Sequence, residues 1–227
     1  MALYDRLLQV VLPASCPGCA TPAPALCPSC RAGLLAPPAA SPPPGVDWWV
    51  AAFAYEGALR ELVARAKYRG ARTGWGWLAE ALAEAVAEAE GAPALQAVTW
   101  PPTTPARRRQ RGFDQAEWLA RRVAGELSLP ARPLLRRRPG PAQTGRDRRA
   151  RAEHGPAFVA SPAAHGACLL VDDVATTGAT LASAAAALRA GGAVTVAAAT
   201  AARTPHRGDG GKNYQDGLKA PLRGADF

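Results

Sequence analysis

The sequence predicts an α/β protein with a doubly wound parallel sheet flanked by helices, and three observations support this fold class. The apolar run at residues 169–171 is typical of a strand buried on both faces. The Ala-rich stretch after Thr180 has strong helix-forming composition and is closed by Gly191 and Gly192. A second apolar run at residues 193–200 predicts the next buried strand of the sheet.

Further elements are predicted earlier in the chain from the hydrophobic pattern and from the positions of glycine and proline, which interrupt helices and strands. Strands are expected at 48–55, 95–100 and 134–135, and helices at 59–70, 78–90 and from 114 onward. In the last helix, Asp114 is the expected cap, with Glu117 completing a capping box. Residues 103–111 are expected to form a loop, and the Arg-, Gly- and Pro-rich segment 136–153 a mobile loop.

The composition also divides the chain into regions. We expect a cysteine-bearing knuckle with a short amphipathic helix at 1–35 and a Pro-rich linker at 36–47, followed by the main domain at 48–205 and a disordered tail at 206–227. No run of about eighteen apolar residues is present, so no membrane span is expected and the protein is predicted to be cytoplasmic.

Four cysteines near the N-terminus form two Cys-x-x-Cys pairs: Cys16, Cys19, Cys27 and Cys30. Four thiolates complete a closed tetrahedral shell, which favours a structural zinc ion. Two disulfides or an iron–sulfur cluster are the alternatives. Cys168 stands alone at the start of an apolar strand and is interpreted as a core residue rather than a nucleophile.

Positive charge is concentrated in one part of the chain. The net charge is +9, and residues 106–153 alone hold fourteen Arg against five acidic residues, which equals that surplus. Guanidinium groups bind phosphate oxygens bidentately, so a phosphate-rich ligand is indicated. A diphosphate and a nucleic-acid backbone both fit this charge, and a solvated basic face is the plainer alternative.

The most specific stretch follows the apolar run at 169–171. Asp172 and Asp173 come first, and then a turn that carries threonines around Gly178. Free amides and the dipole at a helix N-terminus favour an anion, and glycine lets the backbone approach a phosphate closely. Paired carboxylates suit sugar hydroxyls or a metal ion carrying a phosphorylated sugar. The alternative is an ordinary strand-turn-helix with surface acids.

This stretch resembles the ribose-phosphate signature of type I phosphoribosyltransferases: apolar residues, two acids, then Thr-Thr-Gly-x-Thr. The cysteine array, the Lys67-Tyr-Arg-Gly segment and the Arg111-Gly-Phe segment narrow the resemblance to the ComF family, competence-associated proteins of the ComFC type. It covers about residues 1–205 and implies a type I phosphoribosyltransferase-like fold with an N-terminal zinc knuckle. Residues 99–102, Asp114 and His154 depart from the family pattern.

The resemblance implies a site. Asp172 and Asp173 would hold the ribose hydroxyls as the catalytic residues, and phosphoribosyl pyrophosphate would bind with Mg²⁺. The 5′-phosphate would lie against the turn formed by Val174, Ala175, Thr176, Thr177, Gly178, Ala179 and Thr180. Further substrate contacts are expected from Lys67, Arg107, Arg109, Arg111, Arg149 and Arg151. For Lys67, complementing the dipole at its helix C-terminus is the alternative role.

The cluster of arginines at 107–111 precedes the predicted helix that Asp114 begins, where free amides would form a second anion site.

The function implied by the resemblance is binding of phosphoribosyl pyrophosphate or ribose 5-phosphate groups, in the context of DNA uptake during natural transformation. Transfer would occur at ribose C1 if the protein turns over. A salvage phosphoribosyltransferase is one alternative. Another is a non-catalytic protein that binds single-stranded DNA through its arginines and six tryptophans, or that docks on a competence helicase. For the tryptophans, packing is the simpler explanation.

Overall fold

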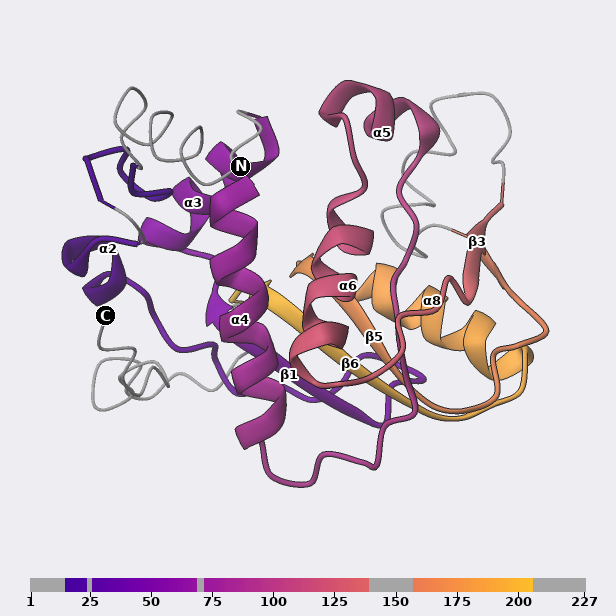
Figure 1. Cartoon of the computed structure of the whole chain (residues 1–227). Coiled ribbons are helices and arrows are strands. Elements are labelled where there is room, and N and C mark those ends of the chain that lie inside the picture. Colours follow the sequence, from indigo (N-terminus) through magenta and orange to yellow (C-terminus); the bar gives the residue numbers. More distant parts are fainter. Residues whose placement is uncertain (1–14, 24–25, 69–71, 139–156, 206–227) are drawn as a thin grey trace.

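The computed structural model describes residues 15–23, 26–68, 72–138 and 157–205. In these ranges a four-stranded sheet has the order β1-β6-β5-β2, and all of its pairs are parallel (Figure 1). The strands are β1 (Trp48–Ala54), β2 (Ala97–Thr99), β5 (Gly166–Ala175) and β6 (Ala193–Arg203). A separate antiparallel ribbon pairs β3 (Leu135–Arg137) with β4 (Phe158–Ala160). The predicted parallel sheet is confirmed.

Helices cover both faces of the sheet. One face is covered by α3 (Gly57–Tyr68), α4 (Arg72–Glu88) and α6 (Gln115–Glu126), and the other by α8 (Ala179–Ala190) with the β3–β4 ribbon (Figure 1). Alternate residues of β5 therefore enter two different cores: Leu169 and Val171 pack on the α3–α4–α6 side, and Cys168 and Leu170 on the α8 side. This burial on both faces explains the continuous apolar run in the sequence.

Cys168 is a buried core residue, as its position in the sequence suggested. Burial raises the pKa of its thiol to about 11, so the group is protonated at neutral pH.

Several element boundaries differ from the prediction. The strand β5 continues through Asp172 and Asp173 to Ala175 because its pairing with β6 extends to Arg203. The helix α4 begins at Arg72, well before the predicted start at 78. Its early turn includes Gly74, where an added Cβ would lie 3.1 Å from Pro17 of the cysteine knuckle. Glycine has a low helix propensity, so the sequence gave little reason to expect a helix here. In the structure this first turn of α4 packs closely on the cysteine knuckle.

Two segments predicted as loops are regular structure. Residues 105–111 form the helix α5 (Pro105–Arg111), in which the Thr104 hydroxyl accepts from Arg107 N and proline occupies the first turn. Thr-Pro is a start signal for a helix. The segment was nevertheless predicted as a loop because a run of arginines follows this signal. Arg136 and Arg137 belong to β3, because they pair with β4 rather than with the main sheet.

The N-terminal knuckle shares the core of the main domain. It carries the short helix α2 (Pro28–Ala32), and its residues Cys16, Leu26 and Leu34 lie in the same cluster as Leu62 and Trp75. The predicted linker also lies against the domain: Arg203 donates to Pro38 O at 2.8 Å, and Arg189 Nε to Gly45 O at 2.9 Å.

The predicted N-terminal helix, most of the predicted loop 136–153 and the predicted tail 206–227 lie outside the described residues. None of the described helices is long and apolar enough to cross a membrane.

Candidate functional site

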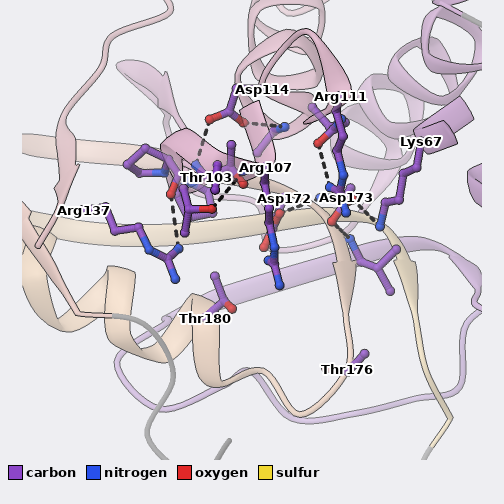
Figure 2. Close-up of a pocket in the computed structure, with 17 residues that line it drawn as sticks. Lys67, Thr103, Arg107, Arg111, Asp114, Arg137, Asp172, Asp173, Thr176 and Thr180 are labelled. Carbon is purple, nitrogen blue, oxygen red and sulfur yellow. Dashed lines mark hydrogen bonds and ion pairs between the residues drawn. The ribbon is translucent and has the colours of Figure 1, made fainter. Parts of the chain in front are cut away.

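A cleft of about 810 Å³ lies at the carboxyl-terminal edge of the sheet, beyond the ends of β2 and β5 (Figure 2). In parallel α/β sheets this is the edge at which ligands bind. Its walls come from separate parts of the chain: the end of α3, the segment after β2, α5, the start of α6, β3 and the β5–α8 turn. The lining residues with polar side chains are Lys67, Thr103, Thr104, Arg107, Arg111, Asp114, Gln115, Arg137, Asp172, Asp173, Thr176 and Thr180.

The two adjacent acids lie at the end of β5 and are half-buried. Asp172 Oδ1 accepts a hydrogen bond from Asp173 N at 2.8 Å, and Asp173 Oδ1 accepts one from Val174 N at 2.7 Å. These backbone contacts fix the position of both carboxylates on the wall of the cleft. Paired acceptors held in this way suit a ligand with two neighbouring hydroxyl groups.

The environment of Asp172 disfavours its charged form. Burial raises the pKa of this carboxyl well above that of an ordinary aspartate, and the neighbouring Asp173 carboxylate raises it further. The hydrogen bond from Asp173 N and the ammonium of Lys67 act in the opposite direction. Carboxyl groups with strongly shifted pKa values cluster at functional sites, which supports assigning a ligand to this edge.

Lys67 reaches the acids from the last turn of α3. Its Nζ lies 2.6 Å from Asp173 Oδ2, and the two side chains are only 18% and 17% exposed. In Figure 2 Lys67 approaches Asp173 from one side of the cleft, while Arg137 lies on the other. Lys67 thus lines the predicted site, and its partner in this structure is a carboxylate.

The turn after the acids leads from β5 into α8 through a glycine, and its role as a phosphate-binding turn stays a prediction. Gly178 caps α8 in the left-handed region at φ 75° and has no side chain with which to accept from the helix amides. Thr176 and Thr180 line the cleft, whereas Thr177 does not, and its Oγ1 accepts from Ala179 N, the first amide of α8, at 3.4 Å. Amides at a helix N-terminus that lack such a partner can bind an anion. Ala175 is part of the core on the α8 side.

The opposite wall is α5. Arg107 and Arg111, one helical turn apart, line the cleft, whereas Arg109 is exposed and is not among the lining residues. The structure thus divides the arginine cluster between the cleft and the outer surface. The predicted Arg149 and Arg151 lie outside the described residues.

Asp114 caps α6, as predicted, at the position of the predicted second anion site. Asp114 is 6% exposed, and its Oδ1 accepts from Ala116 N at 3.1 Å and Glu117 N at 3.3 Å. Its carboxylate already occupies the position that an anion would take at this helix N-terminus. The Glu117 side chain pairs with Arg121, so among the described contacts only half of the capping box is present.

Several cleft residues were not identified as site residues from the sequence. Thr103 N donates to Asp114 Oδ2 at 2.8 Å, and Arg137 Nη1 to Pro102 O at 3.4 Å. Gln115 is 3% exposed and accepts from Arg111 Nη1 at 2.9 Å. Within the described chain, Gln115 Nε2 and Arg111 Nε are buried donors without a partner. Such donors call for an acceptor, which a bound phosphate or carbonyl oxygen can supply.

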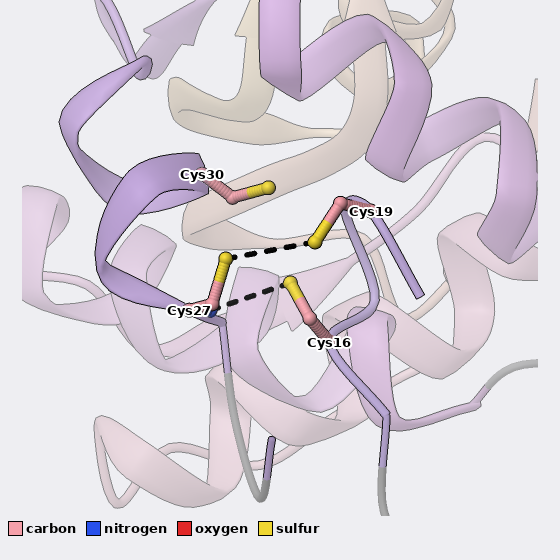
Figure 3. A group of neighbouring side chains, drawn as sticks. All are labelled: Cys16, Cys19, Cys27 and Cys30. Carbon is pink, nitrogen blue, oxygen red and sulfur yellow. Dashed lines mark hydrogen bonds between the residues drawn. The ribbon is translucent and has the colours of Figure 1, made fainter. Parts of the chain in front are cut away.

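A second candidate site is formed by the four N-terminal cysteines (Figure 3). Their sulfur atoms all lie within 4.8 Å of one another, and Cys19 Sγ and Cys27 Sγ are 3.6 Å apart. Four thiolates around one zinc ion at bond lengths of about 2.3 Å would have sulfurs roughly 3.8 Å apart. All four are free thiols here. The cluster can therefore bind a metal ion such as zinc.

Local hydrogen bonds prepare part of this cluster for deprotonation. Hydrogen bonds from the hydroxyl and the backbone amide of Thr21 lower the pKa of the Cys19 thiol to about 6. Burial raises the pKa of Cys30 to about 12. A metal ion would take up the fourth sulfur by displacing its proton.

The six tryptophans pack against other parts of the protein, and each is buried or half-buried. Trp75 donates to Ala66 O inside the core, and Trp77 stacks on Phe53 with ring centroids 5.4 Å apart. Arg121 lies over Trp100 and Arg122 over Trp118. Packing therefore accounts for these residues, which are not arranged as a stacking platform for bases.

No protein-family model matches the sequence, and no curated protein matches it significantly. Among solved structures, the chain is similar to glutamine phosphoribosylpyrophosphate amidotransferase from B. subtilis, complexed with ADP and GMP. The identity is 20% and the TM-score 0.39, over 57% of this chain and 27% of that one. A second structure, of the allosteric regulatory enzyme of purine biosynthesis, gives 20% identity and a TM-score of 0.38, over 57% of this chain and 26% of that one. At these values the similarity does not bear on activity.

Proposed function

We propose that this chain binds a phosphoribosyl group, as phosphoribosyl pyrophosphate or ribose 5-phosphate, in the cleft at the carboxyl edge of the sheet. The observation that carries the proposal is the convergence of three chemistries in that cleft. The lining includes the two acids, two threonines of the turn and two arginines of α5: Asp172, Asp173, Thr176, Thr180, Arg107 and Arg111. A ribose ring with a phosphate at one end and a diphosphate at the other carries the complementary groups.

Each part of the cleft has a role in this proposal. The acids accept hydrogen bonds from the ribose 2′- and 3′-hydroxyls, and the α8 N-terminus holds the 5′-phosphate. Arg107, Arg111 and Arg137 offset the negative charge of the diphosphate. Mg²⁺ would accompany the diphosphate and reduce its charge.

If the protein turns over, the bond between ribose C1 and the diphosphate oxygen breaks and the diphosphate leaves with the electron pair. An acceptor nucleophile then forms the new bond to C1. The residues of the cleft contribute mainly by positioning the ribose and stabilising charge. The resemblance to ComF proteins would place this activity in DNA uptake, with the zinc knuckle as a structural module.

The test is calorimetric titration of phosphoribosyl pyrophosphate with Mg²⁺ into the wild type and into the double variant Asp172→Asn/Asp173→Asn. We expect binding by the wild type and at least a tenfold loss of affinity in the double variant, since neutral amides are weaker acceptors for hydroxyl donors. Glu126→Gln, which removes an exposed acid of α6 outside the cleft, is the matched control. Absence of binding by the zinc-loaded wild type would refute the proposal.

A second candidate function is binding of a nucleic-acid backbone, favoured by the exposed arginines Arg108 and Arg109 of α5. Their guanidinium groups are available to phosphates outside the cleft. Affinity for an oligonucleotide should then fall steeply with salt, and Arg108→Gln/Arg109→Gln should reduce that slope. An unchanged slope would rule out this surface. Because the tryptophans are packed, base stacking is not expected to contribute.

A further inference from the structure

We propose that Lys67 is the fixed counter-cation of the acid pair, so that Asp172 and Asp173 bind a sugar diol without a directly coordinated divalent cation. This inference rests on the proposed function and specifies how its site is neutralised. Lys67 would thus be a positioning residue that acts through Asp173. Mg²⁺ would enter only with a diphosphate.

The contacts of Asp173 are the starting point. Its Oδ2 lies 2.6 Å from Lys67 Nζ, and its Oδ1 accepts from Val174 N at 2.7 Å. Asp172 Oδ1 is also engaged, by Asp173 N at 2.8 Å. Three of the four carboxylate oxygens therefore already have a donor or a cation from the protein itself.

These contacts fit a directly bound Mg²⁺ poorly. Magnesium requires near-octahedral oxygen ligands at about 2.0–2.1 Å and gives up its water reluctantly. An ammonium in contact with Asp173 occupies one approach to the carboxylate and repels a dication. Hydroxyl donors make a weaker demand, because a carboxylate has roughly four lone-pair sites and can accept from a ligand beside its present partners.

The fold fixes Lys67 in this position. Successive side chains of a strand point to opposite faces, so Asp173 shares the face of Leu169 and Val171, which pack in the core that includes α3. Leu62 and Ala66 bury α3 in the same core, directly before Lys67 in the sequence. The ammonium is thus delivered to Asp173 by a packed helix, with little of the side chain exposed.

The competing explanation is that Lys67 only complements the dipole at the end of α3. Arg65 provides the matched control, because it lies in the same last turn and does not line the cleft. Arg65→Gln and Lys67→Met each remove one positive charge from that turn. Only the second variant should affect the acid pair.

The first experiment measures ribose 5-phosphate binding by calorimetry in buffer freed of divalent cations, with the zinc content of the protein verified. We expect the wild type and Arg65→Gln to bind equally well with and without Mg²⁺. Lys67→Met should lose at least tenfold in affinity in the metal-free buffer, and Lys67→Arg should retain most of it. Wild-type binding that requires Mg²⁺, or Lys67→Met binding like the wild type, would overturn the inference.

The second experiment does not depend on the sugar ligand. Mn²⁺ binding is followed by electron paramagnetic resonance in the absence of any phosphate compound. Lys67→Met should bind Mn²⁺ at least tenfold more tightly than the wild type, and the gain should disappear in Lys67→Met/Asp173→Asn. If neither ribose 5-phosphate nor phosphoribosyl pyrophosphate with Mg²⁺ binds but this gain is found, the proposed function fails and the role of Lys67 stands. No gain in Lys67→Met would refute that role, as would wild-type Mn²⁺ binding that Asp173→Asn removes.

Discussion

The charged form of the Asp172 carboxyl lowers the stability of the folded protein, because this group is held beside a second acid in a buried position. Burial and the adjacent Asp173 raise the pKa of its carboxyl, so the folded protein holds this proton more tightly than the unfolded chain does. The resulting stabilisation is complete below the ordinary aspartate pKa of about 4 and is lost as the pH rises through the higher pKa of the folded state. Groups retained at such a cost are typical of binding sites.

Asp172→Asn should therefore stabilise the protein near neutral pH, because the amide keeps the acceptor for Asp173 N and removes the buried charge. The advantage over the wild type should shrink as the pH falls from neutral toward the ordinary aspartate pKa of about 4, since the wild-type carboxyl becomes protonated. For a chain of this size each kcal/mol would raise Tm by about 2–4 °C. Urea unfolding across this pH range measures the effect, with Glu126→Gln as control. A variant less stable than the wild type at pH 7 would contradict the prediction.

Asp114 is the other acid whose role depends on its neighbours. It caps α6 through Oδ1 and holds the segment after β2 through Thr103 N on Oδ2. Asp114→Ala should cost about 1–2 kcal/mol of unfolding free energy. Asp114→Asn should cost less, because the amide oxygen can still cap the helix although its nitrogen cannot accept from Thr103. Equal losses in the two variants, measured by urea unfolding, would mean that the cap contributes little.

At the scale of elements, the β5–α8 turn depends on one glycine. Gly178 has a φ of 75°, and a Cβ there would lie 3.0 Å from Pro43 Cγ. The segment predicted as a linker therefore packs directly on the candidate phosphate-binding turn. The contact ties the Pro-rich segment to the geometry of the site.

Gly178→Ala should cost at least about 1–2 kcal/mol, since the left-handed conformation is strained for residues with a Cβ. Gly125→Ala in α6 is the contrasting variant, because its φ is not positive and nothing lies within 4 Å of the added methyl group. That change should stabilise the protein by about 0.5 kcal/mol. Chemical denaturation measures both, and a neutral Gly178→Ala would show that the turn relaxes without cost.

At the scale of the whole molecule, the cysteine knuckle is joined to the main domain by a shared core. Cys16, Leu26 and Leu34 lie in one cluster with residues of α3 and α4. The helix α3 in turn carries Lys67 to the acid pair. The stability of the knuckle and the position of a cleft residue are thus linked through one packed helix.

We expect one zinc ion per chain by elemental analysis, and removal of the metal by a chelator should lower the Tm of the whole protein, because metal binding and folding of such sites are coupled. Cys27→Ser should reduce both zinc content and Tm. Cys168→Ala, which removes a cysteine from the other core, should leave the zinc content unchanged. Zinc loss with an unchanged Tm would contradict the linkage, and intact disulfides found by mass spectrometry would exclude the metal site.

The local pattern of residues was sufficient to predict the sheet and the clustering of the cysteines. The strand before Asp172 was recognisable because both of its faces are buried, and the turn at Gly178 because its chemistry is local. The pattern failed at α5, where a Thr-Pro helix start preceded four arginines, and at β3, whose partner β4 lies beyond a long segment of sequence. Non-local pairing leaves little signal in a short window.

The local sequence was therefore enough to predict the parallel sheet, the four-cysteine cluster and the acid–threonine turn, because each depends on residues close together in the chain. The tertiary structure was needed to establish which arginines of α5 enter the cleft, that Asp114 also accepts from Thr103 N, and that Lys67 contacts Asp173. Those outcomes depend on how α3, α5 and α6 are oriented around the end of β5. Packing of separate elements sets these orientations, and a single stretch of sequence does not encode them.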